Sequence, residues 1–477
     1  MLPTTWFYLS SLMIVAIFFK FNRFWSIRNL DLVGLVLTTP GLLFLAMNHD
    51  KWGYLWLYVA GVVLMIRLFL DLFMVRRPLL EPNLNPSGMS FACVLILGFM
   101  LANITINRGD SVQSLGTLRL EQILTMKEWN STQTESLRKP PGFPPFYALV
   151  DMTNQVLAPD RSFIHHLPPW KDVQHGTLSL PKNATPVSHP PETETTNPGE
   201  LTLDKELSEM LVSVPVVQVQ EEIVYPDVKE SFWITFVAIG AVSLAQLAIA
   251  LGLIYIAHCH FNNLYTGISA ATLYFLLPYT NQMTGRLDHV LPAALIVWAV
   301  AMYRRPVFSG IMIGLASSLV FYPFFLVALW CSFYWKRGMI RFLTGTVSMI
   351  ALFYLLLLLS PGELGTYSDQ LLNMLGLNSL FMANPDGLWL FYPTSYRIPL
   401  MAVYIVFCLV MLIWPSRKNL ASLITCSTIL LLGTQFWKAW QGGLFMAWYL
   451  PLLLLVFFRP NLEDRVASTT VIDYRKN

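Results

Sequence analysis

The sequence has few charged residues. Asp, Glu, Lys and Arg make up 12% of its 477 residues, while hydrophobic residues make up 55%. Soluble domains carry roughly 25% charged residues, so this scarcity excludes a water-soluble globular protein and predicts a membrane protein. The net charge of +3 comes from an excess of basic residues in the apolar part of the chain. We interpret that excess as a determinant of membrane topology and not as a nucleic-acid surface.

Paired cysteines are also missing. The sequence has no CxxC pair, and its five cysteines lie in or beside apolar runs: Cys93, Cys259, Cys331, Cys408 and Cys426. This pattern predicts neither a disulfide framework nor a zinc site. His258-Cys259-His260 places two metal-binding side chains together, but no acidic residue accompanies them, so we predict no metal site.

Motifs of nucleotide and hydrolase chemistry are missing as well. The chain contains no Walker A motif, no G-x-G-x-x-G after a strand, no HExxH and no G-x-S-x-G. A built-in nucleotide motor or an organic cofactor therefore has no support. Any high-energy donor must arrive already activated, and whether a divalent metal takes part stays open.

Long apolar runs are what the sequence does have. A helix needs about 20 residues to cross a hydrocarbon layer of about 30 Å. Runs of this length or somewhat shorter predict an all-α polytopic membrane protein with about 13 transmembrane helices. The first run is expected to be retained, because Lys20 and Arg23 follow it in place of a cleavage site. The runs lie near residues 7–19, 31–47, 54–75, 89–104, 232–257, 263–279, 289–303, 306–320, 322–335, 342–360, 398–414, 419–433 and 444–458.

Basic clusters indicate the orientation of these helices. By the positive-inside rule we expect the clusters near residues 20–28, 76–77, 304–305, 336–341, 417–418 and 459–465 to be cytoplasmic. The uncharged stretch from Val307 to Trp335 lies between two of them, so it must go out and come back. We predict two short helices hinged near Tyr322 and Pro323, since proline breaks a helix and disfavours helix before it.

Four segments follow from this topology. Residues 1–104 are predicted to be N-terminal transmembrane helices, and residues 105–231 a long extracytoplasmic loop. Within the loop, the region near 182–200 is rich in Pro, Thr and Glu and is expected to be disordered. Residues 232–460 form the main transmembrane core, and residues 461–477 form a cytoplasmic tail.

Acidic residues on the predicted outer face are candidates for acid–base chemistry. Asp110 follows an apolar run, and its carboxylate could take a proton from an acceptor hydroxyl during group transfer. Its alternative is a solvated loop acid at the membrane boundary. Asp288 lies between Arg286 and His289, so an acid, a base and a titratable imidazole are close together. Arg286 could bind phosphate oxygens and His289 could titrate near neutrality; the alternative is an ion pair that only anchors a helix end.

Two further basic residues are predicted on the same face. If Arg397 and Lys438 converge with Arg286, they would form a cationic pocket for a phosphate; singly, each could instead snorkel to the interface. The aromatic residues around them, including Trp437 and Trp448, suit an interfacial belt or stacking on sugar rings.

The middle of the chain resembles a known family of membrane enzymes. Residues 284–290 read TGRLDHV, residues 303–310 read YRRPVFSG, residues 314–323 read GLASSLVFYP, and residues 336–338 read KRG. In this order they resemble the GT-C superfamily, and within it the bacterial polyprenyl-phosphate-mannose-type transferases. The resemblance covers roughly residues 232–345. One departure is Val320, where many relatives have Lys just before Phe-Tyr-Pro. The other is the first outer loop, where the family's acidic residue has no clean counterpart; Asp110 is the nearest candidate only if residues 1–80 are an added N-terminal helical unit.

The resemblance implies a glycosyltransferase in a bacterial inner membrane. Such an enzyme moves a sugar from a polyprenyl-phosphate carrier to an acceptor on the extracytoplasmic face. Asp110 or Asp288 would then be catalytic, and Arg286, His289, Arg397 and Lys438 would bind substrate. The expected partners are the lipid-linked sugar donor and membrane lipids, and not nucleic acid. A transporter or flippase of lipid-linked or amphipathic solutes and a non-catalytic membrane assembly protein remain alternatives.

Overall fold

The apolar runs fold into helices joined by short turns. The structure, a computed structural model, describes residues 3–74, 79–106, 232–282, 285–359, 387–416, 418–438 and 441–473. In these ranges one isolated β-bridge joins Asn419 and Val466. The helices are α1 (Pro3–Phe18), α2 (Ile27–Val36), α3 (Thr38–Ala46), α4 (Asp50–Phe73), α5 (Pro86–Ile106), α11 (Phe232–Phe261), α12 (Leu264–Leu276), α13 (Pro278–Gln282), α14 (Leu287–Ala301), α15 (Pro306–Leu319), α16 (Phe325–Phe333), α17 (Met339–Leu359), α19 (Arg397–Ile413), α20 (Leu420–Trp437), α21 (Leu450–Phe458) and α22 (Ala467–Thr470), with 3-10 turns η1 (Phe21–Arg23), η6 (Tyr322–Phe324), η8 (Gly387–Leu390), η9 (Thr394–Tyr396) and η10 (Met446–Trp448).

Several of these helices match a membrane in length and composition. Among the described residues, five spans are long and apolar enough to cross one: Ile27–Ala46, Asp50–Phe73, Pro86–Ile106, Phe236–Phe261 and Leu420–Trp437. The prediction of a helical chain is therefore confirmed, and these spans have the length and composition of transmembrane helices. Residues 107–231 of the predicted loop, including Asp110 and the region near 182–200, lie outside the described residues.

The predicted break in the uncharged stretch is confirmed. Helix α15 ends at Leu319, and Val320 has an extended backbone. The turn η6 then contains Pro323, and α16 starts at Phe325. Pro323 lacks an amide hydrogen and cannot continue the hydrogen-bond ladder of α15, which explains why one apolar stretch forms two helices.

The last apolar run is shorter as a helix than predicted. Residues 444–458 form the turn η10 and then α21, which has nine residues. At 1.5 Å per residue this helix covers less than half of a hydrocarbon layer of about 30 Å. The chain before it turns at Gly443, whose φ of 88° favours glycine. The fourth run, predicted at residues 89–104, is longer as a helix than predicted. It forms α5, which continues to Ile106, two residues beyond the predicted end.

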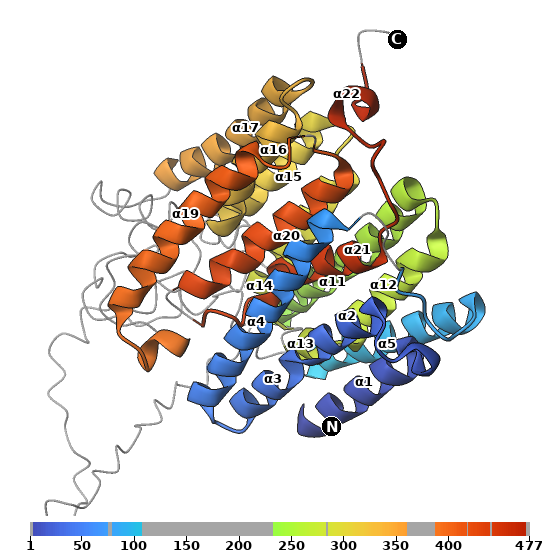
Figure 1. The fold of residues 1–477 in the computed structure, drawn as a ribbon. Coiled ribbons are helices and arrows are strands. Elements are labelled where there is room, and N and C mark those ends of the chain that lie inside the picture. The colour runs from blue at the N-terminus through green and yellow to red at the C-terminus, as the bar shows by residue number, and fades with distance from the viewer. Residues whose placement is uncertain are drawn as a thin grey trace, which may run out of the picture. The chain divides into compact units, whose positions relative to one another are not determined.

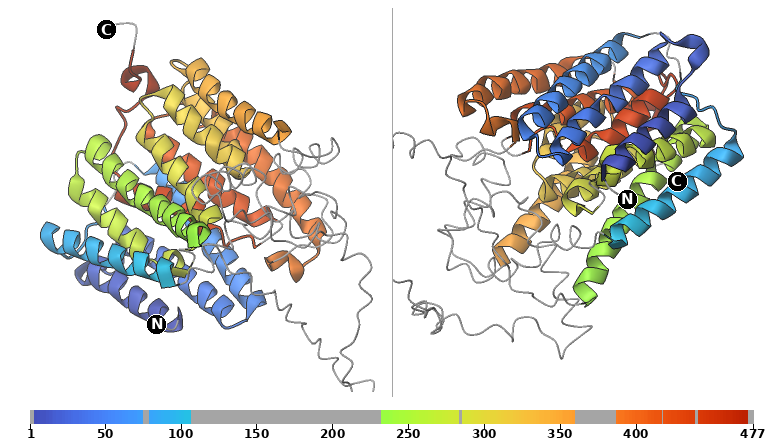
Figure 2. Two further views of the ribbon diagram at one scale, coloured as in Figure 1. Left: turned by 180° about the vertical axis from the view of Figure 1, so that it is seen from behind. Right: turned by 90° about the horizontal axis from the view of Figure 1, so that it is seen from below.

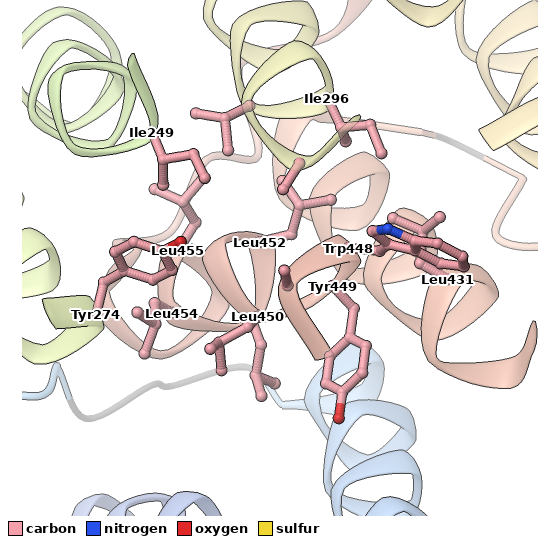
Figure 3. Packing of buried hydrophobic residues seen from close by; sticks show 14 of the residues in the cluster. Ile249, Tyr274, Ile296, Leu431, Trp448, Tyr449, Leu450, Leu452, Leu454 and Leu455 are labelled. Carbon is pink, nitrogen blue, oxygen red and sulfur yellow. The ribbon is translucent and has the colours of Figure 1, made fainter. Parts of the chain in front are cut away.

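Helices α20 and α21 form the centre of the bundle. Every residue of α21 is buried, as expected for a helix that is apolar on all sides. Figure 3 shows its leucines packed among Ile249 of α11, Tyr274 of α12 and Ile296 of α14. Helix α20 lies between α4 on one side and α16 and α19 on the other (Figure 1). The residues before and after the long loop therefore share one core.

The N-terminal helices pack directly on the later ones. Helix α5 runs alongside α12 and also contacts α11 (Figure 2). Asn103 of α5 donates a hydrogen bond from Nδ2 to the Oδ1 atom of Asn281 in α13, at 3.2 Å. Helix α1 contacts α12 and α13 as well. Residues 1–106 thus support the segment that leads into α14.

The C-terminal tail returns to two of the predicted cytoplasmic turns. Arg337 forms an ion pair with Asp473 at 3.2 Å and donates a hydrogen bond to the Ser468 carbonyl at 3.0 Å. The Ile472 amide donates to the Arg304 carbonyl at 3.0 Å. These contacts put the tail and both basic turns at the same end of the helices, in agreement with the charge pattern.

The tightest helix pair gives a stability prediction. Helices α15 and α17 approach so closely at Gly310 that an added Cβ would clash with the Phe342 carbonyl oxygen. We therefore expect Gly310→Val to lower the free energy of unfolding by about 1–3 kcal/mol, the usual cost of overpacking. Denaturant titration of the purified protein in detergent would measure this. Gly98→Val in α5 is the matched control, because nothing lies within 4 Å of its added Cβ; equal losses in both variants would contradict the prediction.

Candidate functional site: an ion pair beside a caged lysine

An arginine–aspartate pair lies at the start of α14. Arg286 is the N-cap residue and Asp288 lies in the first turn. The Nη2 and Nε atoms of Arg286 lie 3.0 and 3.4 Å from the two carboxylate oxygens of Asp288, so the contact is bidentate. An acidic residue in the first turn is favoured by the helix dipole. The side chains of Arg286 and Asp288 are 34% and 15% exposed, so the pair is accessible from one side.

His289 lies behind this pair and is fully buried. Its Nδ1 atom is 2.7 Å from the Tyr279 hydroxyl. Its ring stacks on Phe445, with the ring centroids 4.2 Å apart. The Nε2 atom is 3.9 Å from the Asp288 carboxylate, which is beyond hydrogen-bond distance. Contacts from α13 and from the segment before η10 therefore fix the imidazole ring.

Lys438 approaches the same place from the end of α20. Its side chain is buried, and its ammonium lies over three aromatic rings: 2.6 Å from the centroid of Phe445, 4.7 Å from Trp448 and 5.6 Å from Tyr322. Cations are attracted to the faces of such rings. Burial lowers the pKa of Lys438 well below its usual range, while the Asp288 carboxylate acts in the opposite direction. The charge of Lys438 therefore depends on nearby anions.

Trp448 connects the aromatic rings around Lys438 to the start of α14. Its indole Nε1 donates a hydrogen bond of 3.4 Å to the Asp288 carbonyl. Trp448 and Trp437 are only 2% and 1% exposed. Both tryptophans therefore belong to the core at this site, and an interfacial belt does not describe them.

Arg397 lies next to this cluster and outside its ion pair. It is the first residue of α19, is 4% exposed, and donates from Nε to the Trp437 carbonyl at 3.1 Å. It also acts electrostatically on Tyr322, one of the rings around Lys438. Neither Arg397 nor Lys438 extends to the surface, so snorkelling explains neither side chain.

The sequence-based candidates are thus partly brought together. Arg286, Asp288 and His289 lie together, and Lys438 lies over Phe445, the ring on which His289 stacks. Arg397 donates to the carbonyl of Trp437, the residue before Lys438. Asp110 lies outside the described residues. The sequence analysis did not identify Tyr279 or Phe445 as site residues. Tyr279 lies in the short helix α13, which carries no motif, and Phe445 is distant in sequence from His289. Within the described residues, no group of three or more His, Cys, Asp or Glu side chains could hold a metal ion.

A second charged cluster lies near the basic turns, at the ends of α20 and α21 that are away from Lys438 and Trp448. Arg67 of α4 donates from Nη2 to Asp31 of α2 at 2.9 Å, and its Nη1 atom lies 3.6 Å from Asp71. The guanidinium of Arg459, which follows α21, pairs with Asp71, and Thr425 of α20 donates to the same carboxylate at 3.0 Å. Sequence analysis missed this cluster, although charged residues inside apolar runs were the available signal.

Comparison with known proteins adds no relative. No family model, no curated protein and no solved structure matches this chain. The function is therefore argued from the geometry of the site and from the sequence.

Proposed function

We propose that this chain is an integral membrane glycosyltransferase of the GT-C type, with about 13 transmembrane helices. It would transfer a sugar from a polyprenyl-phosphate carrier to an acceptor on the extracytoplasmic side of a bacterial inner membrane. One observation carries the proposal. The partly exposed Asp288 carboxylate is held by Arg286 and lies within the electrostatic influence of the buried Lys438, at a helix start predicted to face outward.

These groups suit a displacement at the anomeric carbon. A carboxylate takes the proton of the acceptor hydroxyl as its oxygen forms the new bond to the sugar. The bond between the anomeric carbon and the phosphate oxygen breaks, and the electron pair leaves with the lipid phosphate. Cationic side chains stabilise the charge that develops on this phosphate. We assign the proton transfer to Asp288 or Asp110, and stabilisation of the phosphate to Arg286 and Lys438.

Arg397 and His289 have supporting roles in this proposal. Arg397 holds the Trp437 carbonyl directly before Lys438, so it positions the chain that carries the lysine. His289 faces Asp288 from the buried side. Trp448 is buried and supports the start of α14 through its hydrogen bond to the Asp288 carbonyl.

Transfer by the purified protein tests the proposal. The full chain is reconstituted in lipid and given a panel of radiolabelled polyprenyl-phosphate sugars, with membrane extract as the acceptor. We expect label to move from at least one donor. Asp110→Asn is compared with the wild type to examine the second candidate carboxylate. If a folded protein transfers no sugar from any donor, the transferase is contradicted and the transporter and assembly alternatives are favoured.

A further inference from the structure

The hydrogen bonds around His289 determine which ring nitrogen carries its proton. Tyr279 is 2% exposed, and its hydroxyl lies 2.7 Å from the Nδ1 atom of His289. Among the described residues, Nδ1 is the one hydrogen-bond partner of this hydroxyl. Either the hydroxyl donates its proton to Nδ1, or a protonated Nδ1 donates to the hydroxyl oxygen.

Nδ1 of His289 is the acceptor that this arrangement provides. A tyrosine hydroxyl keeps its proton near neutral pH, because the ordinary pKa of a phenol is about 10. If Nδ1 carried a proton too, two donors would face each other and the buried Tyr279 hydroxyl would lose its acceptor. The proton of the neutral imidazole therefore lies on Nε2.

The Nε2 atom is buried and lies on the side of the ring that faces Asp288. Nε2 has no hydrogen-bond partner among the described residues, although the ring is fully buried. Asp288, which is 3.9 Å away, is the nearest charged oxygen and is too distant to accept. Stacking on Phe445 fixes the plane of the ring, and the contact of Nδ1 with Tyr279 fixes its orientation within that plane. A buried donor without a partner is uncommon in folded proteins, and a bound group that supplies the acceptor would explain it.

We propose that Tyr279 is a positioning residue that holds His289 as its Nε2–H tautomer, and that this N–H donates to a phosphate oxygen of the lipid carrier. The inference rests on the proposed function, because it deepens the role of the same site. His289 would then recognise phosphate as a neutral donor, beside the cations Arg286 and Lys438. Asp288 would keep its carboxylate for the acceptor.

NMR of the histidine nitrogens tests the tautomer without any need for activity. The full chain is labelled with 15N-histidine in phosphatidylcholine nanodiscs, and the His289→Gln spectrum identifies the signals of His289. We expect an unprotonated Nδ1 and a protonated Nε2 in the wild type, and a changed Nδ1 signal with both tautomers present in Tyr279→Phe. Tyr274→Phe is the matched control: it is also buried, but its hydroxyl bonds to Gln246, so the His289 signals should not move.

Adding polyprenyl phosphate to the nanodiscs tests the ligand. We expect the Nε2 signal of His289 to shift, and the apparent affinity in Tyr279→Phe to fall about twofold, because in an equal mixture of tautomers only half of the protein carries the Nε2 proton. A protonated Nδ1 in the wild type, or an Nε2 signal that polyprenyl phosphate does not move, overturns the inference. Sugar transfer together with an unmoved Nε2 signal would leave the transferase standing without this role. A shifted Nε2 signal without sugar transfer would support the phosphate contact and contradict the transferase.

Discussion

Arg459→Leu is expected to lower the free energy of unfolding by about 3–5 kcal/mol, the usual effect of breaking a buried ion pair from one side. The Arg459 guanidinium is 0% exposed and the Asp71 carboxylate is 1% exposed, so neither can exchange its partner for water. Without the arginine, Asp71 keeps Thr425 and the more distant Arg67, at 3.0 and 3.6 Å. Of the charged side chains described in this cluster, two carboxylates and one guanidinium then remain, those of Asp31, Asp71 and Arg67.

A double-variant cycle separates the ion pair from lost packing. Asp71→Leu combined with Arg459→Leu is expected to cost less than the sum of the two single variants, because neither charge is then left buried alone. Denaturant titration in detergent measures all three variants. Arg28→Leu is the matched control, since its pair with Glu81 is exposed and should contribute about 1 kcal/mol or less. If Arg459→Leu costs no more than Arg28→Leu, the cluster does not stabilise the fold.

The same cluster shows what hydropathy can and cannot predict. Apolar runs and prolines act locally, so the helices and the hinge at Pro323 follow from the sequence. The contact between Asp71 and Arg459 joins residues 388 positions apart, and no local pattern indicates it. It ties α4 to the end of α21, although the sequence placed these segments in separate regions. Pairing of distant helices depends on side-chain complementarity, which a single sequence does not display.

The candidate site likewise contains residues that the sequence predicted and residues that it did not. Arg286, Asp288 and His289 are neighbours in sequence, so one motif was enough to indicate them. Lys438 was predicted from its charge alone, and its aromatic cage depends on the turn at Gly443 that brings Phe445 under it. Tyr279 reaches His289 only because α13 folds back toward α14. Residues that act through such turns carry no recognisable spacing.

Asp288→Asn is expected to reduce sugar transfer about 10²–10⁴-fold, the range that a positioned general base contributes. Asparagine keeps the size of the side chain and can still accept a hydrogen bond from Arg286, but it cannot take a proton from the acceptor hydroxyl. It also removes the negative charge that supports the ammonium form of the buried Lys438. Both effects act on the transfer step, so the loss should appear mainly in kcat.

The control for this variant is an aspartate on the same predicted face. Asp50 begins α4 and is exposed, so Asp50→Asn should retain nearly all transfer activity. Unfolding midpoints of both variants show whether a loss reflects misfolding, since Asp288→Asn also weakens the contact with Arg286. If a folded Asp288→Asn variant transfers sugar at the wild-type rate while Asp110→Asn does not, Asp110 is the base. Asp288 would then serve only to orient Arg286 toward the phosphate.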